Sequence, residues 1–171
     1  IRGKHVTGVQ TCALPIFTDG SGGNRLYMPA GGSRQPATHE TVDQRLHYLK
    51  QDGREVYKSA VRGMADAAKT LLERNGFSDK DVNLFIPHQA NKRIIDATAK
   101  RLGLSEEQVL VNIDRVANTT AGTIPIGLSE TVNEGRLAEG DLVVLAAFGA
   151  GFTWGADRKS TRLNSSHVLI S

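Results

Sequence analysis

Apolar side chains recur every three or four residues along 54–75, and this spacing predicts the longest helix of the chain. Gly76 follows, at the place where many helices end on a residue in the left-handed conformation. A single apolar stripe of this length indicates a helix that packs on one face of a sheet. The stripe consists of Val56, Ala60, Met64, Ala67, Ala68 and Leu71.

Two apolar runs, 83–86 and 109–113, lack polar alternation, which is typical of parallel strands that are covered on both faces. Between them an amphipathic pattern along 92–102 predicts a helix, with Asn91 as its N-cap and Gly103 at its end. Strand, helix and strand within about thirty residues are the size of a right-handed crossover unit. The two strands are therefore expected to lie parallel in one sheet.

The remaining pattern predicts a third helix between 124 and 135, a strand at 142–148 and an antiparallel partner strand at 152–156. Residues 17–37 are rich in Gly, Ser, Asn and Pro, and favour at most an edge strand at 25–28. The expected fold class is α/β, with a mixed, mostly parallel sheet and helices packed on it.

The two ends of the chain are related to each other as DNA. One choice of codons for residues 6–16 gives, on the opposite strand in its own frame, codons for residues 157–167. The shared DNA resembles a common sequencing adapter, so we expect 1–16 and 157–171 to be foreign and the latter disordered. The expected native part, 17–156, is one domain truncated at both ends. The alternative is a flexible basic tail at each end.

Excluding both ends changes the charge balance. The full chain carries 21 basic and 18 acidic residues, a net charge of +3. The ends hold five of the basic residues and one of the acidic ones, so 17–156 has 16 and 17, a net charge of −1. This balance gives no argument for nucleic acid binding. The only cysteine, Cys12, lies in the excluded end, so we reject it as a nucleophile or metal ligand.

Membrane and metal classes find no support either. No apolar run approaches the roughly 20 residues that span a bilayer, and no secretory signal remains, so we expect a cytoplasmic protein without membrane association. His39 and His47 have no Cys, Asp or Glu nearby at ligand spacing, and both are interpreted as surface or half-buried histidines. No metal site is expected.

His88 and Asn118 are the candidate site residues, because each follows one of the two apolar runs. The carboxyl ends of parallel strands meet at one edge of a sheet, where open α/β folds bind their ligands. We therefore interpret His88 and Asn118 as one site. The structural alternative is that His88 caps the following helix and Asn118 makes a turn.

Four segments carry a resemblance to a known family: PHQAN at 87–91, KRIIDATAKRLGL after it, ANTTAGTIP at 117–125 and AFGAGFTWGA at 147–156. They resemble the C-terminal half of β-ketoacyl-ACP synthase III, an acyltransferase of the thiolase-like superfamily. The resemblance implies a thiolase-like fold and the decarboxylative Claisen condensation of an acyl-CoA primer with malonyl-ACP, which initiates fatty acid biosynthesis. It also implies acyl carrier protein and a coenzyme A thioester as partners, a homodimer, and no cofactor.

By this resemblance, His88 and Asn118 serve the decarboxylation of malonyl-ACP. Loss of CO2 places negative charge on the thioester oxygen, which two neutral N–H donors stabilise in the transition state. An amide donates at any ordinary pH, and the position of His88 ahead of a helix N-terminus favours the neutral imidazole. The resemblance also assigns Asn91 to the pantetheine channel and Phe148 to packing against the pair, although a core role explains Phe148 equally well.

Basic residues on the helix along 92–102 are implied to contact the acidic carrier protein. These residues are Arg93, Lys100 and Arg101. The alternative is a solvated helix face, which is how most charge runs are used.

The resemblance places the nucleophilic cysteine in an upstream half, so we expect the chain alone to be poorly soluble and inactive in condensation. Two other readings stay open. One is a thiolase-like relative that acts on other acyl groups in secondary metabolism, and the other is a non-catalytic half-domain that binds a carrier protein. The DNA upstream of the Phe17 codon distinguishes them, since a cysteine at a strand-to-helix turn supports the enzymes.

Overall fold

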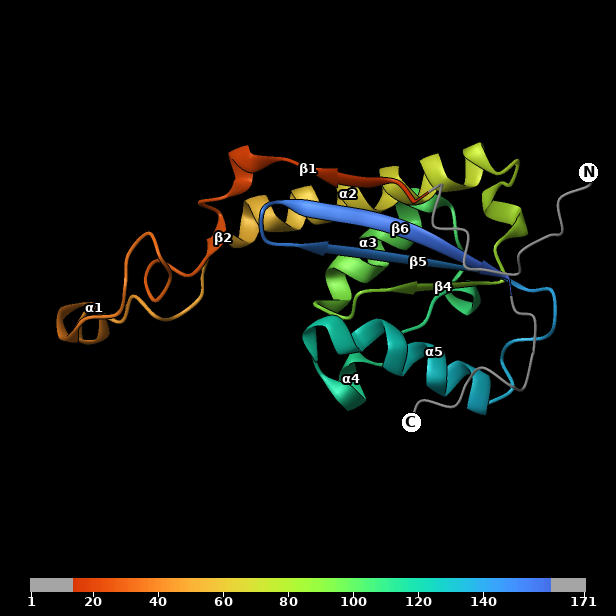
Figure 1. Cartoon of the computed structure of the whole chain (residues 1–171). Helices are drawn as coiled ribbons and strands as arrows, with labels where there is room; N and C mark the ends of the chain where they lie inside the picture. The colour runs from red at the N-terminus through yellow and green to blue at the C-terminus, as the bar shows by residue number, and fades with distance from the viewer. Residues whose placement is uncertain (1–13, 161–171) are drawn as a thin grey trace, which may run out of the picture.

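A four-stranded sheet in the order β1-β6-β5-β4 forms the centre of the protein (Figure 1). The computed structural model describes residues 14–160. β4 and β5 run parallel, whereas β6 is antiparallel to both of its neighbours, β5 and β1. The class is α/β with a mixed sheet, as predicted, but in the described part only one pair of strands is parallel. The strands are Ile16–Thr18 (β1), Leu84–Pro87 (β4), Leu142–Gly149 (β5) and Thr153–Ser160 (β6).

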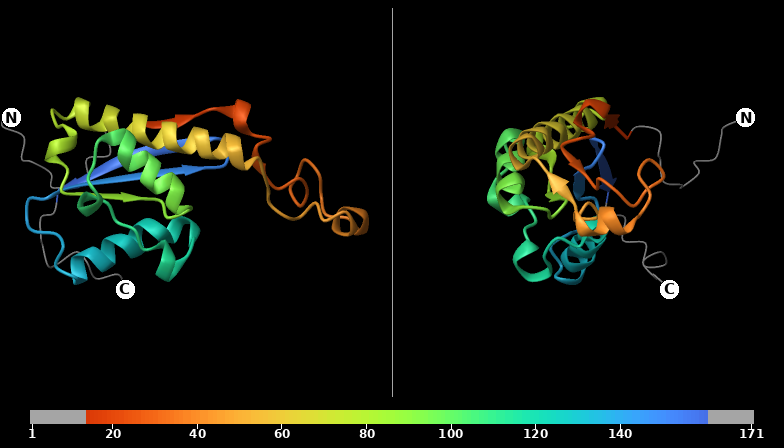
Figure 2. Two further views of the ribbon diagram at one scale, coloured as in Figure 1. Left: turned by 180° about the vertical axis from the view of Figure 1, so that it is seen from behind. Right: turned by 90° about the vertical axis from the view of Figure 1, so that its left-hand side faces the viewer.

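Helices cover both faces of this sheet (Figure 2). α2, Gly53–Arg74, and α3, Lys92–Leu102, pack on one face, and α5, Thr123–Asn133, packs on the other. All three lie close to their predicted positions, because each was marked by a local apolar stripe. Gly76 and Gly103 both have positive φ, +73° and +81°, as expected for residues that end α2 and α3.

Shorter elements connect these layers, and residues 26–51 form an arm that projects from the body (Figures 1 and 2). A two-stranded sheet of β2 and β3 lies at the base of the arm, which confirms the predicted edge strand at 25–28. The short elements are η1 Gly20–Gly22, β2 Leu26–Tyr27, α1 His39–Asp43, β3 Lys50–Gln51, η2 Asp79–Asp81, η3 Glu106–Gln108, α4 Ile113–Val116 and η4 Thr120–Gly122.

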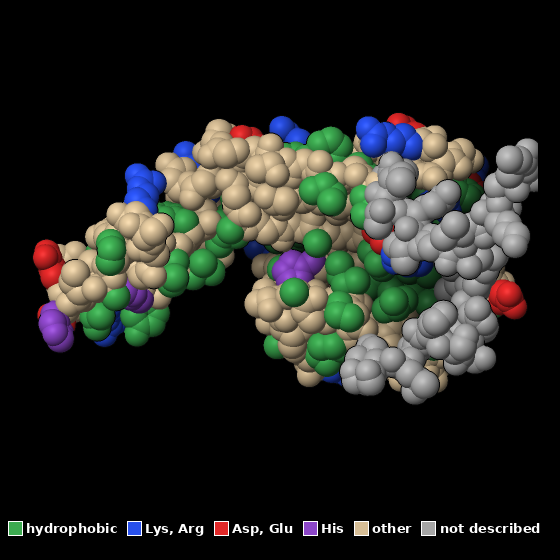
Figure 3. All heavy atoms as spheres, viewed as in Figure 1, with side chains coloured by type: hydrophobic (Ala, Val, Ile, Leu, Met, Phe, Trp, Pro, Cys, Tyr) green, Lys and Arg blue, Asp and Glu red, His purple; other side chains and the backbone are tan. Residues whose placement is uncertain are grey.

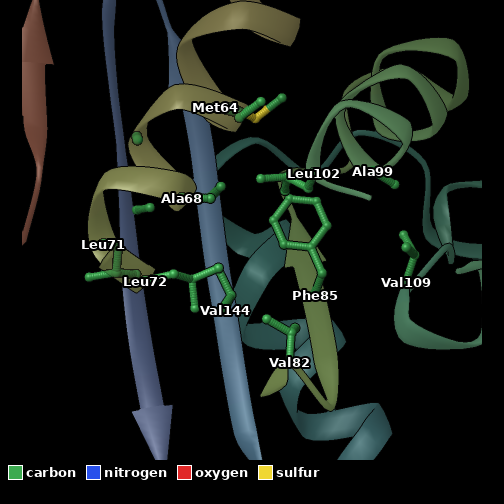
Figure 4. Close-up of a cluster of buried hydrophobic side chains, with 14 of the residues drawn as sticks. Met64, Ala68, Leu71, Leu72, Val82, Phe85, Ala99, Leu102, Val109 and Val144 are labelled. Carbon is green, nitrogen blue, oxygen red and sulfur yellow. The ribbon is translucent and has the colours of Figure 1, made fainter. Parts of the chain in front are cut away.

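The core consists of two clusters, one on each face of the sheet. Phe85 of β4 is fully buried in the larger cluster, among side chains from α2, α3 and β5 that include Met64, Leu102 and Val144 (Figure 4). Alternate residues of β4 and β5 enter opposite clusters, which explains why these strands show no polar alternation. The second cluster contains Leu84, Ile86, Leu110, Leu137, Val143 and Leu145, with α5 packed against it.

The prediction of a regular second strand at 109–113 is wrong. The segment makes only an isolated parallel bridge to Phe85, where Leu110 N donates to the Phe85 carbonyl oxygen at 2.9 Å. The buried side chain of Gln89 then binds the next backbone groups: Nε2 donates to Leu110 O and Oε1 accepts from Asn112 N, both at 3.1 Å. The side-chain amide of Gln89 therefore binds the backbone groups that a neighbouring strand would otherwise bind, and α4 begins directly afterwards.

The last strand is longer than the predicted 152–156. β6 pairs with β5 as far as Ser160, so the expected disorder of 157–171 is wrong for 157–160. Backbone ladder bonds do not depend on side-chain type, and Arg158 Nε also donates to Asn75 Oδ1 at 2.9 Å. Residues 1–13, with Cys12, and 161–171 lie outside the described residues, and the foreign origin of the ends stays a prediction.

Within residues 14–160 no helix combines the length and apolarity needed to cross a bilayer. The same residues contain no group of three or more His, Cys, Asp or Glu side chains that is placed to hold a metal ion. His39 is exposed on α1, and His47 is partly buried with its Nε2 at 2.9 Å from Thr41 Oγ1, so neither histidine belongs to such a group.

Candidate active site

A cavity of about 770 Å³ opens where the carboxyl ends of β4 and β5 meet the first turns of α2 and the base of the arm. His88, Asn118 and Phe148 line it together, with Asn91 and Arg93 from the start of α3. On this side the surface is hollowed beneath the arm, and histidine and hydrophobic side chains form part of the wall (Figure 3). The predicted meeting of His88 with Asn118 on one cavity is therefore a feature of the fold.

The sheet positions the backbone of His88, because its N–H donates to Ala146 O at 2.8 Å and extends the pairing of β4 with β5. The ring Nδ1 lies 2.7 Å from Oγ1 of Thr123, the first residue of α5. Burial lowers the pKa of the His88 imidazole below its ordinary value, which favours the neutral ring. His88 does not cap α3, since Asn91 Oδ1 accepts the Arg93 N–H at 2.9 Å.

Asn118 lies in the loop between α4 and η4. The neighbouring residues Ala117 and Thr120 have φ values of 56° and 53°, and residues other than glycine rarely adopt such positive φ values. Asn118 Oδ1 accepts the Thr120 N–H at 3.0 Å, so Asn118 makes the turn that the structural alternative predicted and also lines the cavity. With the oxygen bound, the amide N–H groups are left as donors. His88 and Asn118 are thus two polar side chains on one cavity wall, and neutral side chains of these two kinds are able to donate hydrogen bonds.

Three other residues that the sequence analysis singled out, Asn91, Phe148 and Arg93, also line the cavity. Asn91 is both the cap of α3 and a cavity residue. Phe148 lines the cavity and packs against the core, with its ring centroid 4.9 Å from that of Phe152, so its core role is present and its packing against the pair stays a prediction. The Arg93 guanidinium lies 5.7 Å from the centroid of the Tyr57 ring at the cavity wall.

Lys100 and Arg101 do not line this cavity. Arg101 forms an ion pair with Asp66 of α2 at 3.1 Å, whereas Lys100 is exposed and has no ion pair among residues 14–160. The structure therefore brings Arg93, but not the other two basic residues, to the mouth of the cavity.

Two residues next to the site were not anticipated from the sequence. Gln89 is fully buried and binds three backbone groups: besides Leu110 O and Asn112 N, its Nε2 reaches Pro87 O at 2.9 Å. Thr123 is 1% exposed and contacts His88. No local pattern marks either residue, because both act on partners whose proximity depends on the fold.

Comparison with known proteins agrees with this arrangement. Residues 72–157 match the family model described as 3-Oxoacyl-[acyl-carrier-protein (ACP)] synthase III C terminal. The curated relative from Solibacter usitatus (strain Ellin6076), named beta-ketoacyl-[acyl-carrier-protein] synthase III, is 59% identical over 138 residues, which cover 81% of this chain and 42% of the relative. The relative of the same name from Chlorobium luteolum is 56% identical over 141 residues, 82% of this chain and 43% of that one.

A solved structure from the same family is also similar to this chain. The synthase III from Thermus thermophilus is 41% identical, with a TM-score of 0.75 over 87% of this chain and 45% of that chain. The fold and site define an α/β protein with a polar pair at the carboxyl edge of its sheet. The chain belongs to the 3-oxoacyl-ACP synthase III family, whose C-terminal domain it matches. It spans less than half the length of these relatives.

Proposed function

We propose that this chain provides the anion-stabilising part of a β-ketoacyl-ACP synthase III that condenses an acyl-CoA primer with malonyl-ACP. The observation that supports this most strongly is the shared cavity of His88 and Asn118, two neutral groups that come from separate loops. The relatives that carry the synthase name match the chain over more than four fifths of its length.

His88 and Asn118 act when the carbon–carbon bond of the malonyl group breaks. The bonding electrons move to the thioester oxygen, CO2 leaves, and the two N–H donors bind the enolate oxygen. The enolate carbon then attacks an acyl thioester on a cysteine, and the cysteine thiolate leaves. By family resemblance that cysteine belongs to a part of the whole enzyme outside this chain. No cofactor takes part in these steps.

The acyl carrier protein docks beside Arg93. This residue is exposed at the first turn of α3 and lies at the cavity mouth, where an acidic carrier would bring its thioester arm. Lys100 lies seven residues further along the same helix, so it shares this face and adds to the positive potential there. Arg101 contributes less, because Asp66 already compensates its charge. The whole enzyme is proposed to be a cytoplasmic homodimer.

A chimera tests the catalytic roles. Residues 17–156 of this chain replace the matching part of the Solibacter usitatus relative, and ketoacyl-ACP formation and CO2 release are measured. We expect His88→Ala and Asn118→Ala each to lower kcat by about 10²–10³, the usual cost of one such donor. His39→Ala, on the exposed helix α1, is the control and keeps full activity. Retention of activity in both site variants contradicts the proposal.

Carrier binding is tested with charge reversals in the same chimera. Arg93→Glu is expected to raise KM for malonyl-ACP and to reduce its salt dependence, since charges at the rim of an interface act mainly on association. Lys80→Glu is the control, because η2 precedes β4 and lies at the opposite edge of the sheet from the cavity. Equal effects of the two reversals on KM exclude docking beside Arg93.

A further inference from the structure

Thr123 is a buried polar residue with two hydrogen-bonding neighbours in the candidate site. Its Oγ1 lies 2.7 Å from His88 Nδ1 and 3.1 Å from Thr120 O. A hydroxyl group has a single hydrogen, so it donates to only one of these two acceptors at a time. The direction of this one hydrogen determines which nitrogen of a neutral His88 ring carries the proton.

The two arrangements differ in what His88 offers to the cavity. If Thr123 donates to Thr120 O, then Nδ1 must donate to Oγ1, and Nε2 of the neutral ring is a bare acceptor. If Thr123 donates to Nδ1, then Nε2 carries the hydrogen and is a donor. Thr120 O already accepts the Thr123 backbone N–H, so this carbonyl does not need the hydroxyl. Among the described residues, His88 Nδ1 has no other partner than Thr123.

Thr120 also fixes the orientation of the second site residue, the side-chain amide of Asn118. Thr120 N donates to Asn118 Oδ1 at 3.0 Å, so the oxygen end of that amide is bound and the N–H end is left for the cavity. An unbound amide or imidazole can present either a donor or an acceptor, and only the donor stabilises an anion. Residues 120 and 123, three positions apart, thus contact both members of the pair.

We propose that Thr123 is a positioning residue whose hydroxyl donates to His88 Nδ1 and thereby holds His88 in the tautomer with its N–H on Nε2, facing the cavity. The inference rests on the proposed function for its catalytic meaning, although the tautomer itself is a property of the folded chain. When His88 is protonated, the hydroxyl turns to Thr120 O and accepts the Nδ1–H instead. The direction of the Thr123 hydroxyl hydrogen therefore changes with the protonation state of the His88 ring.

Solid-state nitrogen NMR on the full 171-residue chain, labelled at histidine, tests the tautomer directly and does not depend on the solubility of the chain. The measurement is made above the pKa of histidine, and the His88 signals are identified by their loss in His88→Gln. We expect hydrogen on Nε2 in the parent chain and in Thr123→Ser, which keeps the hydroxyl. Thr123→Val has nearly the same shape without a hydroxyl, and is expected to show a mixture of tautomers. Hydrogen on Nδ1 in the parent chain, or an unchanged ratio in Thr123→Val, overturns the proposal.

Activity of the chimera supplies the second measurement. Thr123→Val is expected to lower kcat for malonyl decarboxylation about tenfold, part of the cost of a lost donor, with KM unchanged, and Thr123→Ser to stay near the parent value. Fluorescence of Trp154, the only tryptophan in this chain, checks in the full chain that each variant folds. An inactive parent chimera with the expected tautomer refutes the proposed function alone. An active chimera whose Thr123→Val variant keeps its kcat refutes the role of Thr123.

Discussion

Gly127→Ala is predicted to destabilise the protein, although alanine is the better helix residue. Gly127 lies inside α5 and faces the sheet, where a Cβ atom would be 2.4 Å from Leu110 Cδ2 and 3.2 Å from Ile86 Cγ2. Both neighbours are buried, at 2% and 0% exposure. Ordinary contact begins at 3.4 Å, so α5 or Leu110 has to move by about 1 Å. The close packing of α5 on Leu110 and Ile86 therefore favours glycine over alanine at this position.

The magnitude follows from two opposing effects. Replacing glycine by alanine inside a helix contributes about 0.5–1 kcal/mol to stability. Overpacking a closely packed core costs about 1–3 kcal/mol. The net expectation is a loss of about 1–2 kcal/mol. With an m-value of about 1–3 kcal/mol/M in urea, a loss of this size lowers the unfolding midpoint by roughly 0.3–2 M.

Urea unfolding of the full chain at low concentration, followed by Trp154 fluorescence, measures this loss. Trp154 packs over Gly63 of α2, so its emission reports the packing of that helix on the sheet. Gly53→Ala is the matched control, because Gly53 begins α2 and a Cβ there meets nothing within 4 Å. We expect the control to keep or slightly raise the midpoint. A midpoint for Gly127→Ala that is equal to or higher than that of Gly53→Ala would refute the packing argument.

Three further outcomes are expected. Ala117→Gly should raise the free energy of unfolding by about 1 kcal/mol. Ala117 has φ 56° and ψ −165°, a conformation that costs about 1–3 kcal/mol for any residue except glycine. Glycine also gives the unfolded chain more freedom, which reduces the gain by about 0.4–1 kcal/mol. Equal urea midpoints contradict that strain. Gln89→Leu should cost about 3 kcal/mol, since three buried backbone groups lose their amide partner, and a loss below 1 kcal/mol refutes the role of Gln89 in joining them. Stability should fall as pH drops below about 6.5, because burial lowers the pKa of His88 and the unfolded chain then binds more protons. His88→Gln removes this part of the pH dependence, and an identical pH profile for parent and variant shows that His88 is not its source.

The local spacing of residues was sufficient to predict the longer helices and the location of the candidate site. The stripe along 54–75, the cap at Asn91 and the glycine ends depend on residues within one or two turns of each other, so the order of residues alone predicts them. The meeting of His88 with Asn118 followed from a general rule, that parallel segments end at one edge of a sheet. That rule held although 109–113 is not a regular strand, because this segment still runs alongside β4.

The errors share one physical cause. Burial of 109–113 was evident from its apolar run, but whether a buried segment bonds to a strand or to a side chain depends on what lies beside it. Gln89 lies there because β4 ends at that place. In the same way, the polar residues 157–160 gave no strand signal, yet β5 offered them a complete row of backbone partners.

The sequence by itself thus determined the class of fold, the three longest helices and the two polar groups that meet at the cavity. The tertiary structure decided how those groups are held. Thr123 reaches His88 across 35 positions in the chain, and Gln89 binds Asn112 across 23. A hydrogen bond of this kind forms only when two distant segments are placed to within a few tenths of an ångström, and such placement arises only when the helices and strands have packed together.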